Sequence, residues 1–301
     1  IELIKAMLED GGPPAPGTVT HVDRCLSCLA CTTTCPSGVD YAQLIDHARS
    51  HIEAHHVRPW PERLLRALIP AVLTRPRRLA AALALGRLAR PLEPLLAGLK
   101  LAPLAALLRL VPAPTRRPSA ERTFAAEGKR RGRVVLLQGC VEPAMAPQIR
   151  AAAIRLVTRA GFEVVLADGE GCCGALSEHL GRADEARGMA RTNLQAWKSL
   201  GHVDAVIATA AGCGTMLKSY GRVAGEAVPA RDILEFIAEV GLPPVVAPSG
   251  LPVAYHAACS LQHGQQIKTA PPALLAQAGF EVRLVAEGHL CCGSAGVYNI
   301  L

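Results

Sequence analysis

Four cysteines near the amino end have the spacing of an iron–sulfur ligand loop. Cys25, Cys28, Cys31 and Cys35 follow one another as C-x2-C-x2-C-x3-C, and Pro36 comes directly after them. Thiolates at these intervals wrap a [4Fe-4S] cube, and where two clusters are present the fourth thiolate binds the other one. The spacing therefore predicts a [4Fe-4S] cluster on this motif, in preference to a zinc knuckle or to buried thiols.

The motif occurs once in this sequence, which leaves its fourth cysteine open to two interpretations. Cys35 either closes the same cluster as the first three cysteines or binds a second cluster. The chain begins with Ile1 rather than methionine and ends at Leu301, shortly after its last cysteine motif. We therefore expect both ends of the natural protein to be missing, with a second four-cysteine run before Ile1 that shares its cluster with Cys35.

The other seven cysteines follow a pattern that repeats. Cys140 and Cys259 are 119 residues apart, and so are the two Cys-Cys-Gly (CCG) triplets at residues 172–174 and 291–293. The five-residue sequence Ala-Gly-Phe-Glu-Val at residues 160–164 recurs at residues 278–282. Such matched spacing indicates two copies of one unit.

Apolar runs in both copies alternate with helical patterns. We expect strands at residues 134–137, 162–167, 205–209, 253–255 and 281–285, and helices at residues 144–160, 183–200, 232–240 and 269–278. Alternation of this kind predicts βαβ crossovers and mostly parallel sheets.

Each cysteine group of the repeat follows one of these strands. Because the carboxyl ends of parallel strands meet at one edge of a sheet, we expect the thiolates to converge there. Vicinal cysteines are too cramped for an ordinary disulfide but can hold adjacent metal ions, and glycine permits close backbone approach. The sequence predicts a second metal centre, rather than inert buried thiols, from seven cysteines: Cys140, Cys172, Cys173, Cys213, Cys259, Cys291 and Cys292.

The positive charge of the chain is concentrated in one segment. The net charge is +7, yet residues 57–133 alone hold 17 basic and 4 acidic residues. Prolines divide this Leu-, Ala- and Arg-rich segment into short helical pieces. We predict an α/β fold in four parts: the second half of an α-helical, ferredoxin-like cluster domain at residues 1–56, a basic helical connector at 57–133, and two α/β CCG units at 134–250 and 251–301, the second one truncated.

The composition excludes several classes of protein. Half of the residues are hydrophobic and 19% are charged, which rules out a disordered chain. Aromatic residues make up only 3%, which argues against nucleic-acid binding. No apolar stretch reaches the roughly 18 to 20 residues that cross a bilayer, and no signal-peptide pattern opens the chain. We expect a cytoplasmic protein whose basic connector contacts an acidic partner or the anionic inner face of the cell membrane.

Three segments give the chain a family resemblance. They are Asp168 to Leu176 (DGEGCCGAL), His256 to Gly264 (HAACSLQHG), and Glu287 to Gly296 (EGHLCCGSAG) with Tyr298 and Asn299. Paired CCG units are found in the cysteine-rich subunit of heterodisulfide reductase, in the lactate-utilisation iron–sulfur protein and in the iron–sulfur subunit of anaerobic glycerol-3-phosphate dehydrogenase. The amino-acid sequences of the three segments most resemble the glycolate oxidase iron–sulfur subunit family.

The resemblance implies the electron-transfer subunit of a flavin-dependent 2-hydroxyacid dehydrogenase. Glycolate would be oxidised to glyoxylate on FAD in partner flavoprotein subunits, and this chain, with no catalytic residue of its own, would pass electrons toward a quinone-side acceptor. Gly169, Gly171 and Gly174 match the dinucleotide fingerprint G-x-G-x-x-G, but no acidic residue ends a following strand at the required distance. FAD is therefore expected on the partner subunits only.

Two departures from the family pattern keep other functions open. The family's CCG unit ends in C-x2-C, but Met216 stands three residues after Cys213, and the second unit stops at Leu301. A thiol–disulfide enzyme of the heterodisulfide reductase type and the iron–sulfur subunit of a lactate or glycerol-3-phosphate dehydrogenase complex are the alternatives. A third is an interaction module whose CCG units bind partners or zinc.

Overall fold

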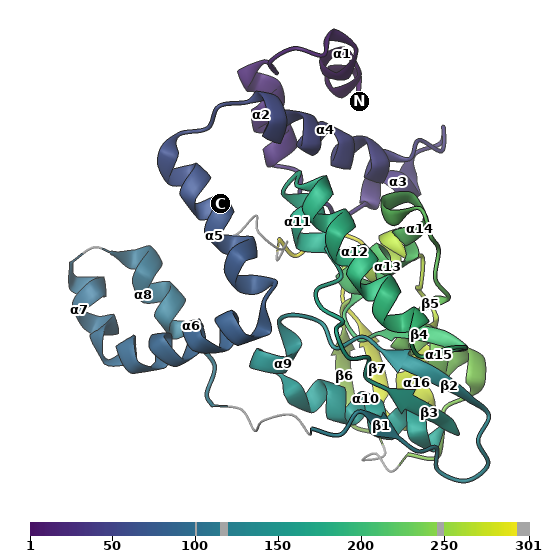
Figure 1. Cartoon of the computed structure of the whole chain (residues 1–301). Coiled ribbons are helices and arrows are strands. Elements are labelled where there is room, and N and C mark those ends of the chain that lie inside the picture. The colour runs from purple at the N-terminus through teal and green to yellow at the C-terminus, as the bar shows by residue number, and fades with distance from the viewer. Residues whose placement is uncertain (100, 115–119, 246–249, 294–301) are drawn as a thin grey trace.

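Helices at the amino end build a small core of their own (Figure 1). The computed structural model describes residues 1–99, 101–114, 120–245 and 250–293. Four helices come first: α1 (Glu2–Asp10), α2 (Pro16–Asp23), α3 (Ala30–Thr34) and α4 (Tyr41–His55). Seven buried side chains of α1, α2 and α4 pack together: Ile4, Met7, Val19, Val22, Ile45, Ala48 and Ile52. Asp40 starts α4, because its carboxylate accepts a hydrogen bond from the amide of Gln43.

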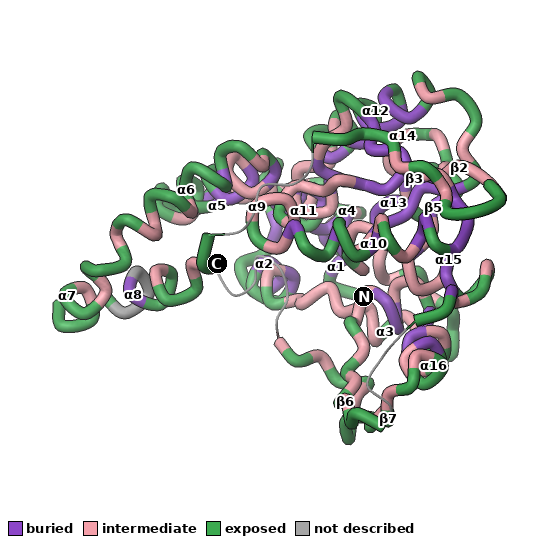
Figure 2. The backbone as a smooth tube through the Cα atoms, turned by 90° about the horizontal axis from the view of Figure 1, so that it is seen from below, coloured by how far each residue is buried: buried purple, intermediate pink, exposed green. Residues whose placement is uncertain are grey.

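Short helices follow, as we predicted from the positions of the prolines. They are α5 (Trp60–Leu73), α6 (Pro76–Ala89), the 3-10 turn η1 (Arg90–Leu92), α7 (Glu93–Gly98) and α8 (Ala102–Arg109). Each has a proline at its first or second position, where the missing N–H costs no intrahelical hydrogen bond. Figures 1 and 2 show α6, α7 and α8 projecting from the side of the molecule, with α7 at the tip.

A five-stranded sheet forms the centre of the first CCG unit. Its strands are β1 (Thr123–Phe124), β2 (Gly132–Leu136), β3 (Phe162–Val165), β4 (Ala205–Ala208) and β5 (Ala230–Asp232). They lie in the order β1-β3-β2-β4-β5, and every neighbouring pair is parallel except β1 with β3. The prediction of a mostly parallel sheet is therefore confirmed.

Helices cover both faces of this sheet. They are α9 (Glu142–Met145), α10 (Pro147–Arg159), α11 (Ala175–His179), α12 (Ala183–Lys198), α13 (Ala211–Lys218), α14 (Tyr220–Ala224) and α15 (Ile233–Val240). Because side chains alternate along a strand, Val134 and Leu136 of β2 pack with α10 and α15, whereas Val135 packs with α12 and α14 on the other face. Figure 2 shows the resulting buried layer inside the molecule.

The second CCG region contributes a separate two-stranded sheet. Its elements are β6 (Pro252–Tyr255), the π-helical turn η2 (Ser260–Gly264), α16 (Ala270–Gln277) and β7 (Glu281–Leu284). β6 and β7 are parallel, and Leu274 of α16 belongs to the same core as Phe236 of α15. The structure thus has two CCG regions with parallel strands. Tyr298 and Asn299 of the family motif lie outside the described residues.

Several local features differ from the expected elements, among them the helices α11, α13 and α14, which were not expected. The helix expected at 144–160 is interrupted at Ala146, since a residue before a proline is disfavoured in helical conformation and Pro147 follows. The strands β1 and β5 were not expected, because each has only two or three residues and no apolar run. β1 comes from the end of the segment assigned to the connector.

The amino-terminal helices lie directly against the first CCG unit. Asp46 of α4, which is buried, pairs with Arg222 of α14 at 3.3 Å. Gly181, after α11, has a φ of +80°, and a Cβ there would lie 2.6 Å from the carbonyl carbon of Arg49. Arg66 of α5 donates a hydrogen bond to the carbonyl oxygen of Leu180 at 3.4 Å. This close contact brings the four-cysteine loop up to the sheet edge where the CCG cysteines lie.

Candidate metal centre

The loop that carries the four-cysteine motif is tightly coiled. Cys25 follows α2, and the chain then bends through Ser27 and Leu29, whose φ angles are +52° and +60°. This left-handed conformation is uncommon for residues other than glycine, and it turns the chain back on itself between the cysteines. Cys31 lies in α3 and Cys35 directly follows that helix.

A buried arginine that sequence reasoning missed holds this loop. Arg49 of α4 donates hydrogen bonds to the carbonyl oxygen of Cys25 at 2.7 Å and to the hydroxyl of Ser27 at 2.5 Å. Its side chain therefore fixes the loop and places a positive charge beside it. Its partners lie 22 and 24 residues earlier in the sequence, so no local pattern indicates the contact.

The thiols of this motif differ in their electrostatic surroundings. Burial raises the pKa of Cys31, and the nearby thiolates of Cys25 and Cys28 raise it further. The pKa of Cys35 is lowered, because backbone N–H groups of Val39 and Ser37 bond its sulfur. Cys25, Cys28 and Cys31 thus form one group of interacting thiols, and a cation shared among thiolates removes this kind of repulsion. Their donor chemistry suits an iron–sulfur cluster.

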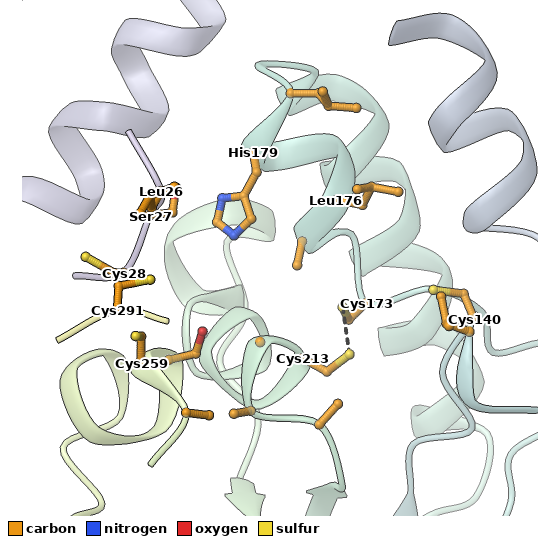
Figure 3. Close-up of a pocket in the computed structure, with 18 of the residues that line it drawn as sticks. Leu26, Ser27, Cys28, Cys140, Cys173, Leu176, His179, Cys213, Cys259 and Cys291 are labelled. Carbon is orange, nitrogen blue, oxygen red and sulfur yellow. Dashed lines mark hydrogen bonds between the residues drawn. The ribbon is translucent and has the colours of Figure 1, made fainter. Parts of the chain in front are cut away.

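The cysteines of the first CCG unit meet at the carboxyl edge of the five-stranded sheet. Cys140 follows β2, Cys172 and Cys173 follow β3, and Cys213 lies in the first turn of α13 after β4. The Sγ atoms of Cys173 and Cys213 are 3.4 Å apart (Figure 3). The structure therefore brings these four cysteines together, across a sequence separation of more than 70 residues.

Hydrogen bonds between these thiols favour one thiolate. The thiols of Cys140 and Cys173, together with the amide of Gly174, hydrogen-bond the sulfur of Cys172 and lower its pKa. The same bonds, with burial, raise the pKa values of Cys140 and Cys173. Cys172 is consequently the preferred anionic sulfur of the group, which is the form that binds a soft metal ion.

Two buried polar residues hold the CCG turn from behind. Asn193 of α12 donates hydrogen bonds at 3.0 Å to the carbonyl oxygen of Cys172 and to the hydroxyl of Tyr220. Tyr220 in turn donates to the carbonyl oxygen of Cys173 at 2.9 Å. Sequence reasoning missed both residues. One sequence signal could have indicated Asn193: it lies on the otherwise apolar face of α12, together with Ala190 and Trp197.

A partly buried carboxylate fixes the start of the same loop. Glu170 accepts hydrogen bonds from the indole N–H of Trp197 at 2.7 Å and from the amide of Gln138 at 2.5 Å. Burial raises the pKa of Glu170 to about 7, because the charged form has lost its solvation. The side chain joins the loop after β2 to the loop after β3, and both loops carry cysteines.

Met216 occupies the place where the family pattern has a further cysteine. Its side chain is buried, one turn after Cys213 on α13. A Cβ at Gly174 would lie 3.2 Å from the terminal methyl group of Met216, so the thioether packs directly beneath the CCG turn. The first unit therefore has four cysteines and a thioether at its edge.

The cysteines of the second unit face the amino-terminal motif. Cys259 precedes η2, and Cys291 and Cys292 follow β7. Burial raises the pKa of Cys259 to about 11, with further contributions from a hydrogen bond to Cys291 and from the charges of Cys291 and Cys28. Figure 3 shows Cys28, Cys259 and Cys291 beside one another.

The π-helical turn η2 joins the three cysteine groups. His263, which is buried, lies 2.8 Å from the hydroxyl of Thr33 in α3 and 3.2 Å from the carbonyl oxygen of His289. Thr215 of α13 donates a hydrogen bond to the carbonyl oxygen of Ser260 at 3.1 Å. π-Helical turns are rare in proteins, and those that occur are often found at functional sites.

One cavity of about 1160 Å³ runs between all three groups. Nine of the eleven cysteines line it: Cys25, Cys28, Cys140, Cys172, Cys173, Cys213, Cys259, Cys291 and Cys292. Cys31 and Cys35 do not line it, and His179 lies between the groups (Figure 3). Among residues 1–99, 101–114, 120–245 and 250–293, no three His, Cys, Asp or Glu side chains already stand as a closed metal site. The sulfurs instead surround a space that is large enough for inorganic clusters.

Comparison with known proteins identifies both CCG regions. Residues 134–218 and 253–300 match the cysteine-rich domain family CCG. Within the described part of the chain, no helix has the length and apolar character needed to cross a membrane. No solved structure gives a significant match to this chain.

Two curated relatives match the whole length of this chain. The glycolate oxidase iron-sulfur subunit of Escherichia coli K12 is 36% identical over 313 residues, which span all of this chain and 73% of that protein. The probable glycolate oxidase iron-sulfur subunit of Bacillus subtilis 168 is 28% identical with the same coverage. Lactate utilization protein A of Geobacillus sp. WCH70 is 26% identical over half of this chain and 67% of that protein. The chain therefore belongs to the glycolate oxidase iron–sulfur subunit family.

Proposed function

We propose that this chain is the iron–sulfur electron-transfer subunit of a flavin-dependent glycolate (2-hydroxyacid) dehydrogenase. Cys25, Cys28 and Cys31 would hold a [4Fe-4S] cluster, which accepts and releases single electrons when bound. Cys35, whose thiolate is stabilised by its own backbone turn, would serve a second cluster together with a motif before Ile1. The division of the chain at residues 56, 133 and 250 is part of the same proposal.

The observation that carries this proposal is the shared cavity. It brings the motif cysteines Cys25 and Cys28 next to both CCG groups, although these groups lie more than 110 residues away in the sequence. The pKa of Cys259 is raised in part by the charge of Cys28, so the two sites influence each other electrostatically. Redox centres held at such sites would be close neighbours, as electron transfer requires.

The CCG cysteines are proposed as a second metal centre. Cys140, Cys172, Cys173 and Cys213 present four sulfurs at one sheet edge, and Glu170, Asn193 and Tyr220 would keep their loops in place. The second unit would contribute three more sulfurs, from Cys259, Cys291 and Cys292. Residues behind a ligand loop set the orientation and electronic properties of a bound metal.

Substrate oxidation is assigned to partner subunits. Oxidation of one 2-hydroxyacid releases two electrons and two protons, so two single-electron transfers through this chain would serve each turnover while the protons leave at the partner's FAD. Two relatives are named as glycolate oxidase subunits and another as a lactate utilization protein, so lactate is the alternative substrate. We propose a cytoplasmic complex with flavoprotein subunits that delivers its electrons to a quinone-side acceptor.

Anaerobic purification followed by iron, sulfide and zinc analysis tests the proposal. We expect at least about four irons and four sulfides per chain, a reduced-state paramagnetic signal at low temperature, and no zinc. Cys28→Ala should abolish the signal of the amino-terminal cluster, whereas Ser37→Ala, a small change beyond the same motif, should preserve it. Colourless protein, or an unchanged signal in Cys28→Ala, would contradict the proposal.

A thiol–disulfide enzyme of the heterodisulfide reductase type is the second candidate. The 3.4 Å separation of the Cys173 and Cys213 sulfurs and the lowered pKa of Cys172 favour it. Reduction of a disulfide substrate that is lost in Cys173→Ala but kept in Cys28→Ala, given an artificial electron donor, would support this second function. Glycolate-dependent reduction of an artificial acceptor in the presence of the flavoprotein would favour the first.

A further inference from the structure

The arm formed by residues 76–110 of α6, η1, α7 and α8 carries an exposed apolar stripe. Leu85, Leu88, Leu92, Leu95 and Leu99 follow one another at intervals of three and four residues. Their exposed fractions lie between 52% and 79%, although the arm is helical throughout this stretch. Such spacing places leucines of the same helix on one side of that helix, and exposed apolar surface of this kind usually marks a contact site.

The same arm is strongly basic. Residues 76–110 contain six basic residues and a single acidic one, Glu93. Glu93 already pairs with Arg109 at 2.5 Å, across the turn from α7 to α8. Arg77, Arg78 and Arg90 are exposed. The surface therefore matches a partner that is negatively charged and apolar at once.

The composition of the arm distinguishes a lipid surface from a protein partner. Residues 76–110 contain no Ser, Thr, Asn, Gln, His, Met or aromatic residue. Protein interfaces are enriched in aromatic residues and Met, and they form about one hydrogen bond per 100–200 Å². A membrane surface requires neither, because it binds through apolar insertion and attraction of basic side chains to anionic headgroups.

We infer that the arm docks this protein on an anionic phospholipid membrane. The leucine stripe enters the boundary between headgroups and acyl chains, and the arginines contact lipid phosphates. On α5, Trp60, Leu64 and Leu68 are also exposed and stand four residues apart, so this neighbouring helix carries an exposed apolar stripe of its own. The helices lie on the membrane rather than cross it. This contact is independent of the metal centre and goes beyond the proposed function.

Vesicle flotation of the full chain tests the inference. Binding is expected to phosphatidylcholine vesicles that contain about 30% phosphatidylglycerol, and it should weaken as salt is raised to about 0.5 M. Leu88→Ser combined with Leu95→Ser should weaken binding at least about tenfold, since both side chains leave the lipid boundary. Arg77→Gln combined with Arg90→Gln should weaken it by about the same factor or more.

A matched pair controls for the loss of charge. Arg155→Gln combined with Arg191→Gln removes two exposed charges from α10 and α12 and should leave vesicle binding unchanged. Iron content, measured in parallel, should stay the same in all variants, so that a failure of the proposed function is recognised separately. Equal binding to neutral and anionic vesicles, or arm variants that lose a flavoprotein partner instead of vesicles, would overturn the inference.

Discussion

The side chain of His263 connects two cysteine groups that are far apart in the sequence. Its Nδ1 lies 2.8 Å from the hydroxyl of Thr33 and its Nε2 lies 3.2 Å from the carbonyl oxygen of His289. Because a carbonyl oxygen only accepts, Nε2 is the donor in the contact with His289. Thr33 lies between Cys31 and Cys35, and His289 precedes Cys291 by two residues. One buried ring thus holds the amino-terminal motif against the second CCG loop.

Replacing this ring should loosen the contact without removing a ligand. His263→Ala leaves the hydroxyl of Thr33 and the carbonyl of His289 without this partner, which should lower the free energy of unfolding by about 1–3 kcal/mol. The reduction potential of the proposed amino-terminal cluster should shift, because the hydrogen bonding around it changes. Chemical unfolding and a redox titration followed by paramagnetic resonance measure the two effects.

His47→Ala is the control for this substitution, since His47 is exposed on α4. It should change neither quantity. A His263→Ala protein with unchanged stability and potential would show that the ring does not couple the two loops.

At the scale of secondary structure, the position of the four-cysteine loop depends on how α4 packs against the end of α11. Arg49 of α4 bonds the loop at Cys25, and the backbone of Arg49 is itself in contact with Gly181. The contact has no room for a side chain at residue 181, and φ there is +80°. Any residue larger than glycine must push α4, and with it the four-cysteine loop, away from the sheet edge.

Gly181→Ala should therefore destabilise the protein by more than backbone strain alone. Gly201→Ala is the matched control, because Gly201 has a similar φ of +75° and no atom within 4 Å of an added Cβ. Gly201→Ala should lower the free energy of unfolding by about 1–2 kcal/mol, because alanine is strained in the left-handed conformation. Gly181→Ala should cost at least about 2 kcal/mol more, since it also overlaps a backbone. Urea unfolding followed by the fluorescence of buried Trp197 measures both, and equal losses would contradict this account.

Some elements could be predicted from the sequence because their signals are local. The strand at residues 134–137 is a run of apolar residues after a basic segment, and proline positions mark the starts of the short helices. β5 has the sequence Ala-Arg-Asp and becomes a strand only because β4 lies beside it. The contacts of Arg49 and His263 could not be predicted, since the partner of His263 lies 230 residues away.

For the molecule as a whole, separate cores meet around one cavity. The helices α1, α2 and α4 have their own core, against which Cys25 and Tyr41 pack. The faces of the five-stranded sheet have two others, and Cys172 and Cys173 belong to one of them. The sheet therefore has apolar packing that does not involve the amino-terminal motif, whereas the small helical core packs directly on a cysteine of that motif.

Loss of the proposed amino-terminal cluster should therefore loosen one part of the molecule and spare the other. Cys28→Ala protein, compared with the intact chain by hydrogen exchange, should exchange faster in the peptides of α1, α2 and α4, because their core is small and loses its packed ligand loop. Amides of β2, β3 and β4 should stay protected, since helices cover both faces of their sheet. Cys213→Ala is the reciprocal control: it should speed exchange in the CCG loops after β3 and β4 and leave α1 and α2 unchanged. If Cys28→Ala instead made the sheet and the amino-terminal helices exchange together, the chain would be a single cooperative unit, and the cluster would stabilise the whole molecule rather than its amino-terminal part.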